Sequence, residues 1–157
     1  MWGVHDIHSM AKRGSLTGLA LTMKFHPDSL KLVGELERKL MEVKEKEGEQ
    51  VLYEGPLRPL CSLAPNNVNT MACAALAGFT VGFDKTQATL ISNKMLHAHI
   101  VEIVVYGPDK GDLGRFSVTT QRVNPSAPGA VTGQATFMSF LNSMLEAGGK
   151  TNGFHFC

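Results

Sequence analysis

Alternation of apolar and polar positions divides the chain into segments with strand-like or helix-like periodicity. Strands repeat every two residues, and amphipathic helices repeat about every 3.6 residues. Apolar residues alternate with small or polar ones over residues 19–25, and shorter apolar runs follow at 51–53 and 86–91. Two longer runs, 99–106 and 115–123, flank a turn rich in Gly, Pro and Asp, so they predict an antiparallel hairpin.

Helical spacing of apolar residues predicts helices over residues 4–13, 35–48, 67–77 and 136–147. The segment 67–77 consists mainly of small apolar residues and has no polar face, so we expect that helix to be buried. The proline-rich stretch before it, which runs to Pro65, predicts a loop or a broken helix. Together these elements predict an α+β domain in which helices cover a mixed sheet that contains antiparallel strands.

The chain has 157 residues, 43 % of them hydrophobic, which is the size and composition of one folded domain. Its net charge of +1 argues against a protein that binds nucleic acid by neutralising phosphates. Ten of the 29 charged residues fall within residues 35–49, which leaves 19 for the other 142 residues. We therefore expect a partner or a further domain to cover part of the remaining surface.

Cysteine usage and the N-terminal sequence point to a cytoplasmic protein. The three cysteines, without CxxC spacing, predict neither a disulfide framework nor a zinc site. The first residues show no basic region followed by an apolar run, as a signal peptide would. The sequence also lacks an apolar stretch of roughly 18 residues, so we expect no contact with a membrane.

The sequence has no glycine-rich phosphate-binding turn. Neither GxGxxG nor GxxxxGK occurs, and the glycines between 107 and 114 have a different spacing and lie in the predicted hairpin turn. The GxSxG and HExxH motifs of hydrolases are also missing.

An asparagine-rich segment stands at the start of the predicted small-residue helix. Asn66, Asn67 and Asn69 precede or open that helix, where asparagine commonly caps the free N–H groups. Three asparagines exceed what one cap needs. The additional carboxamides therefore predict, as the alternative, a site that holds a polar ligand group.

Two histidines stand at the head of the first hairpin strand. On a strand, His97 and His99 would point to the same face as the apolar residues Val101, Ile103 and Val105. Three interpretations stay open: a half-buried structural histidine, a metal pair for which no third ligand is evident, and a general base. Histidine is the side chain best suited to accept a proton near neutral pH.

These two features form part of a wider pattern that resembles the C-terminal domain of the aspartate dehydrogenase family, which has a dihydrodipicolinate-reductase-like fold. Within this pattern, His99 stands at the head of a strand, 30 residues after Asn69. The remaining matching segments are Pro65-x-Asn67-Val68-Asn69-Thr70-Met71-Ala72, Gly82-Phe83-Asp84-Lys85-Thr86, Asn124-Pro125 and Gly129-Ala130-Val131-Thr132-Gly133.

The resemblance implies an oxidoreductase that uses NAD or NADP. Such enzymes convert L-aspartate to iminoaspartate, which hydrolyses to oxaloacetate and ammonia or feeds NAD biosynthesis. The resemblance implies that His99 is the catalytic residue and that Asn69, with Asn67 beside it, contacts the cofactor. The chemistry agrees, since one base active near pH 7 serves both deprotonation of the amine and activation of water. No metal is expected.

The resemblance also implies a domain organisation. We expect a catalytic domain over residues 1–147 and a separate tail over 148–157. The N-terminal Rossmann domain of the family is absent from this sequence, so we expect the chain to be part of a longer enzyme and inactive alone. The last helix would then lack the domain on which it packs. Family members form dimers or larger assemblies, and we expect a homo-oligomer here.

Two questions stay open from the sequence. Arg58 and Arg115 are candidates, by residue type alone, for binding the second carboxylate of L-aspartate. The alternative to an enzyme is a non-catalytic oligomerisation or binding module that retains this fold, because the dinucleotide fingerprint is missing.

Overall fold

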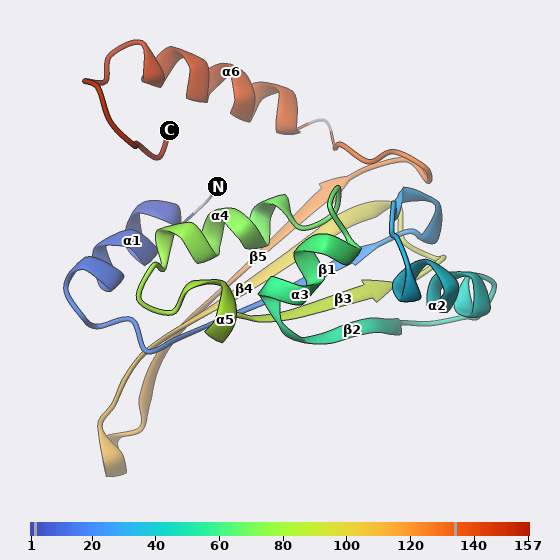
Figure 1. Cartoon of the computed structure of the whole chain (residues 1–157), viewed down its shortest axis with the longest axis horizontal. Helices are drawn as coiled ribbons and strands as arrows, with labels where there is room; N and C mark the ends of the chain where they lie inside the picture. The colour runs from blue at the N-terminus through green and yellow to red at the C-terminus, as the bar shows by residue number, and fades with distance from the viewer. Residues whose placement is uncertain (2, 134) are drawn as a thin grey trace.

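A mixed sheet forms the centre of the computed structural model, which describes residues 1, 3–133 and 135–157 (Figure 1). In this part of the chain the strands are β1 (Gly18–Phe25), β2 (Gln50–Pro56), β3 (Gln87–Ser92), β4 (Ala98–Asp109) and β5 (Arg115–Pro125). Their order is β2-β3-β1-β4-β5. The pair β1 and β3 is parallel, and the other neighbours are antiparallel. The predicted α+β class and mixed sheet are confirmed.

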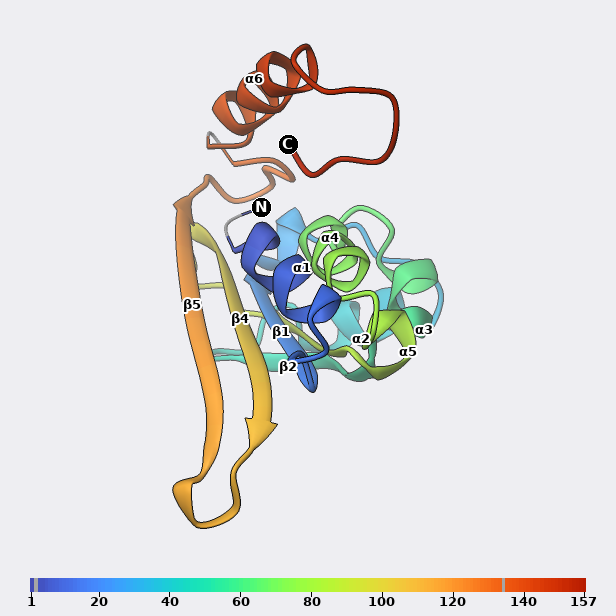
Figure 2. The same ribbon diagram turned by 90° about the vertical axis from the view of Figure 1, so that its left-hand side faces the viewer.

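Helices cover one side of this sheet. In the described part of the chain the helices are α1 (Val4–Lys12), α2 (Glu35–Val43), α3 (Leu57–Leu63), α4 (Asn69–Ala77), α5 (Gly82–Lys85) and α6 (Ala135–Ala147), with 3-10 turns at Pro27–Ser29 and Gly111–Leu113. Of these, α6 does not cover the sheet. Figure 2 shows α1, α3, α4 and α5 on the same side of the strands. No helix among the described residues is long and apolar enough to cross a membrane.

The alternation read from the sequence decides which side of each strand meets the helices. Burial alternates strictly along β1, where Leu19, Leu21, Met23 and Phe25 face the core. The same alternation along β4 buries His99, Val101, Ile103 and Val105. His99 therefore stands at the end of an apolar row, as the hairpin pattern predicted.

The small residues of α4 allow this helix to pack closely in the layer above the sheet. Met71, Ala74, Ala75 and Ala77 are buried, in agreement with the prediction of a buried helix. Leu76 is half exposed, so the helix keeps one outward side. The buried residues fix the axis of α4 and direct its N-terminus towards the end of the sheet where β4 begins.

The structure differs from the predicted elements in three places. The helix expected over 35–48 ends at Val43, its last apolar residue at helical spacing, and the charged residues that follow form a turn. The proline-rich stretch contains the helix α3, because its prolines occupy the cap and the first turn, where no N–H is needed. The helix α5 was not predicted, since four residues are too few to show a period.

The last helix, α6, is present where the sequence predicts it, but its apolar side is exposed. None of its described residues is buried, and Phe137, Phe140 and Leu145 are each about two-thirds exposed. Figure 1 shows α6 set apart from the helices that cover the sheet. Beyond α6 the chain returns, and the ring of Phe156 lies 5.3 Å from that of His8 on α1.

Candidate active site

A cavity of about 320 Å³ lies where the beginnings of α4 and β4 meet the end of β5 and the segment before α6. Its walls come from five separate parts of the chain, because the end of β1 also contributes. They are formed by Met23, Phe25, Asn66, Asn67, Asn69, Thr70, His99, Val101, Arg122, Asn124, Val131, Thr132, Gly133 and Thr136. Asn67, Asn69 and His99, which the sequence singled out, thus line one cavity.

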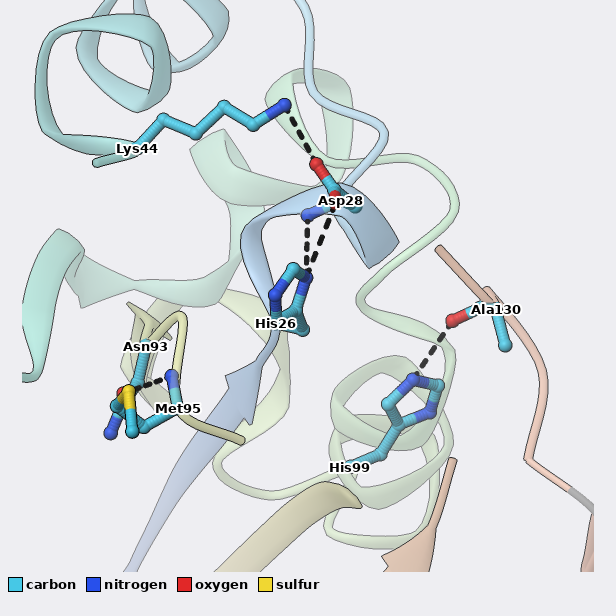
Figure 3. Close-up of polar contacts among 7 residues, drawn as sticks. All are labelled: His26, Asp28, Lys44, Asn93, Met95, His99 and Ala130. Atoms are coloured by element: carbon cyan, nitrogen blue, oxygen red, sulfur yellow. Dashed lines mark hydrogen bonds and ion pairs between the residues drawn. The ribbon is translucent and has the colours of Figure 1, made fainter. Parts of the chain in front are cut away.

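His99 lies at the base of this cavity and is only 7 % exposed. Its Nε2 atom is 3.0 Å from the carbonyl oxygen of Ala130, and its ring stands edge-on to Phe25 with 4.8 Å between centroids. Figure 3 shows the imidazole directed at this carbonyl, which belongs to the segment before α6. Because a carbonyl only accepts hydrogen bonds, Nε2 carries the proton and the neutral ring has its lone pair on Nδ1.

Two opposing effects act on the proton affinity of His99. Burial lowers the pKa of His99 from its ordinary value of 6.5, because the cavity solvates the imidazolium less well than water does. The hydrogen bond to Ala130 raises the pKa, but by less. The imidazole is therefore neutral at pH 7 and able to accept a proton.

Asn67 is buried, and its carboxamide holds another part of the chain. Its Oδ1 atom accepts a hydrogen bond from the N–H of Lys31 at 2.9 Å, and its Nδ2 donates to the carbonyl of Ser29 at 3.1 Å. The helix begins only at Asn69, with Val68 as its cap residue. The interpretation of Asn67 as a helix cap is therefore wrong, because both polar atoms bond to the segment 29–31.

Asn69 is the first residue of α4 and is exposed at the cavity. No side chain caps this end of α4. The carboxamide of Asn69 and the first N–H groups of the helix thus meet at the cavity wall. This arrangement suits a ligand that carries an amide or an anionic group.

His97 does not join His99. The strand β4 begins at Ala98, so His97 precedes it, is exposed and does not line the cavity. The expectation that both histidines share one face of a strand is wrong, because that alternation starts only where the strand starts. Among the described residues, no group of three or more His, Cys, Asp or Glu side chains is placed to hold a metal ion.

Sequence reasoning missed Arg122, which lines the cavity from β5. The two arginines that it named lie elsewhere. Arg58 pairs with Asp84 on the surface, and Arg115 stacks on Tyr106 at 4.6 Å and donates to Thr17. The sequence did carry one clue to Arg122. Residues paired across two antiparallel strands share a face, so the position of Arg122 in the hairpin places it on the same face as His99.

The cavity combines three kinds of chemistry. A buried neutral imidazole offers a proton acceptor, exposed carboxamides offer donors and acceptors, and Arg122 offers a permanent positive charge. No acidic side chain is present among the described residues that line it. The geometry therefore suits a small anionic ligand from which a proton is removed.

Comparison with known proteins gives a consistent result over nearly the whole chain. The family model described as "Aspartate dehydrogenase, C-terminal" matches residues 6–143. The chain is similar to the aspartate dehydrogenase domain-containing proteins of Xenopus tropicalis (47 % identity, 100 % of this chain, 55 % of that protein) and Danio rerio (43 % identity, 100 % of this chain, 54 % of that protein).

A solved structure shares the fold. The crystal structure of an aspartate dehydrogenase from Thermotoga maritima superposes with a TM-score of 0.56 at 17 % identity, and the match covers 98 % of this chain and 52 % of that one. The chain thus spans about half the length of the proteins it matches.

Proposed function

The chain belongs to the family of aspartate dehydrogenase C-terminal domains, and on that basis we propose that it supplies the substrate-binding and acid–base half of an NAD(P)-dependent oxidoreductase acting on L-aspartate. The single observation that carries the proposal is His99, a buried neutral histidine in a cavity that also holds carboxamides and an arginine. The animal relatives carry the family name only as a domain, whereas a relative from Methanococcoides burtonii is named an L-aspartate dehydrogenase.

His99 acts as the general base in this proposal. The amine of L-aspartate must lose a proton before hydride can leave its carbon, and Nδ1 of His99 accepts that proton. Once that proton has passed from Nδ1 to solvent, the same atom can accept a proton from the water that adds to the imine carbon. The hydrogen bond from Nε2 to Ala130 holds the ring in the tautomer that both steps require.

The residues present fit one end of the cofactor. When bound, NAD or NADP supplies the nicotinamide carbon that accepts the hydride. A cavity of about 320 Å³ is at the small end for ligand sites, so it suits a four-carbon acid beside one ring. Asn69, exposed at the opening of α4, would bond to the nicotinamide carboxamide.

Asn67 serves the site in a different way. Through Ser29 and Lys31 its side chain holds the 3-10 turn segment against the start of α4. This positions Asn69 and the free end of the helix. That Asn67 also touches the cofactor stays a prediction.

The remaining parts of the enzyme are also part of the proposal. The phosphates of the dinucleotide require a glycine-rich turn that this sequence lacks, so a Rossmann domain would have to supply it. The exposed apolar side of α6 is consistent with a helix that packs on such a domain. We also expect a homo-oligomer, as in the family.

The test is turnover of L-aspartate by the longest natural form of the protein that carries this sequence. We expect NADH or NADPH to form, followed by absorbance, together with ammonia and oxaloacetate. A folded protein that binds neither cofactor and releases no ammonia from L-aspartate would contradict the proposal and favour a non-catalytic module.

A further inference from the structure

Arg122 occupies a defined position beside His99 in the hairpin. Across β4 and β5, His99 pairs with Asn124 and Val101 pairs with Arg122. Paired residues of antiparallel strands share a face, and so do residues two apart on one strand. His99, Asn124 and Arg122 therefore all lie on the side of the sheet that forms the cavity wall.

Arg122 carries the one permanent charge among the described residues that line this cavity. It is half-buried, and the single hydrogen bond of its side chain to the described residues is a long one, from Nη2 to Oγ1 of Thr70 at 3.5 Å. None of the ion pairs within the part of the chain that the structure describes includes Arg122.

The two arginines that the sequence named, Arg58 and Arg115, are exposed and already engaged. Arg58 has its carboxylate partner in Asp84, and Arg115, on the same strand as Arg122, has its ring partner in Tyr106. A half-buried charge without a counter-ion carries a desolvation cost that a bound anion would offset. Arg122 is thus placed to receive an anionic group from outside the chain.

We propose that Arg122 binds the carboxylate of the substrate side chain, so that it is the residue that selects a dicarboxylic amino acid. This inference rests on the proposed function, in which the substrate carbon that reacts lies next to His99. The two residue pairs are about 7 Å apart along the strands. A group two bonds from the reacting carbon is therefore directed towards Arg122, whereas the α-carboxylate, one bond away, stays near His99.

Thr70 and the start of α4 complete the subsite. The hydroxyl oxygen of Thr70 accepts the long hydrogen bond from Nη2 of Arg122. Thr70 is the second residue of a nine-residue helix whose N-terminus has no side-chain cap. A carboxylate between them would accept one hydrogen bond from the hydroxyl and up to two from the guanidinium. The arginine carries the charge, and the helix end adds to its field.

The experiment measures binding of succinate, a dicarboxylate without an amine, to the full chain by NMR titration. We expect Arg122→Gln to weaken succinate binding by about 10- to 100-fold, the usual cost of losing a charged hydrogen-bond pair. Arg122→Lys should retain part of the affinity. Arg115→Gln is the matched control on the same strand and should bind succinate as the natural chain does.

Butyrate, a monocarboxylate of the same chain length, is the second probe. The natural chain should bind butyrate more weakly than succinate, because a single carboxylate cannot occupy both the Arg122 subsite and the position beside His99. Equal succinate affinity in the natural chain and Arg122→Gln would overturn the inference, and so would the absence of succinate binding to the natural chain. Backbone amide spectra of each variant establish that it is folded.

The two proposals fail separately. Turnover of L-aspartate without any dependence on Arg122 would leave the proposed function intact and reject this inference. Succinate binding that depends on Arg122, in a protein that does not oxidise L-aspartate, would reject the enzyme and retain the dicarboxylate site.

Discussion

The Nε2 atom of His99 lies 3.0 Å from the carbonyl oxygen of Ala130, a residue 31 positions later in the chain. This contact joins the head of β4 to the segment that leads into α6 (Figure 3), and His99 and the neighbouring Val131 both line the cavity. It also settles the orientation and tautomer of the imidazole, because the carbonyl can only accept. The lone pair that remains, on Nδ1, is what the proposed chemistry uses.

Replacing His99 should remove catalysis without unfolding the protein. We expect His99→Ala to reduce kcat for L-aspartate by about 10²- to 10⁴-fold, the usual contribution of a general base. The measurement is steady-state turnover in the longest natural form of the protein, together with a circular dichroism spectrum.

His97→Ala is the matched control for this experiment. His97 lies two residues away, is exposed and does not line the cavity, so its loss should leave turnover unchanged. Equal losses in the two variants, or full activity in His99→Ala, would show that His99 is not the base.

The pH dependence of turnover should reflect the buried position of His99. Since burial lowers its pKa below 6.5, the basic form prevails at neutral pH, and kcat/KM should rise with pH along a limb centred below 6.5. A rising limb centred above 6.5 would mean that another group titrates. His99→Ala should lose the limb altogether.

The same shift links His99 to stability. Because the folded protein has the lower pKa, the unfolded chain binds more protons between that pKa and 6.5. The free energy of unfolding contributed by His99 is therefore complete above pH 6.5 and decreases as the pH falls through this window. Urea denaturation of the natural chain and of His99→Ala between pH 5 and pH 8 measures this contribution, as the difference between the two proteins in how the free energy of unfolding depends on pH. If the natural chain became more stable than the variant on acidification, the prediction would be wrong.

The sequence predicted the sheet because each strand has its own alternation, which needs no knowledge of distant residues. The predicted hairpin also contained the information on which face Arg122 lies, although Arg122 was not singled out from the sequence. A regular hairpin closed at Tyr106 and Arg115 would pair Arg122 with His99, whereas the structure pairs it with Val101 after an irregularity near Tyr106. The difference is two residues, which preserves the face.

The role of Asn67 could not be predicted from its neighbours. Both partners of its carboxamide, Ser29 and Lys31, lie 36 or more residues earlier in the chain. Local propensity favours a cap for asparagine at this place, and tertiary contact overrides it. Likewise, residue type alone named Arg58 and Arg115, but only the fold shows that both already have partners.

Asn67 and Asn69 should respond to substitution in opposite ways. Asn67→Ala leaves the carbonyl of Ser29 and the N–H of Lys31 without partners in a buried region, so we expect about 1–3 kcal/mol of destabilisation. Asn69→Ala removes an exposed side chain with no such bonds and should change stability by less than about 0.5 kcal/mol.

Two measurements distinguish the role of Asn67 in stability from the role of Asn69 in cofactor binding. Thermal unfolding should show the loss only for Asn67→Ala, whereas the KM for NAD or NADP should rise in Asn69→Ala. If Asn69→Ala were the less stable variant, or if its KM for the cofactor were unchanged, the assignment of Asn69 to the nicotinamide would be wrong.

Gly133 should be intolerant of a side chain because of Asn124. A Cβ atom added at Gly133 would overlap Nδ2 of Asn124, so the carboxamide opposite His99 would have to turn away. We expect Gly133→Ala to lower kcat/KM by about 10- to 100-fold, as displaced positioning groups do, with little loss of stability because a carboxamide rotates easily. The side-chain amide signal of Asn124 in NMR spectra should shift in this variant.

Gly148→Ala is the matched control, since its Cβ would make only an ordinary van der Waals contact, at 3.5 Å from the carbonyl oxygen of Leu145. An unmoved Asn124 signal with normal turnover in Gly133→Ala would contradict this prediction.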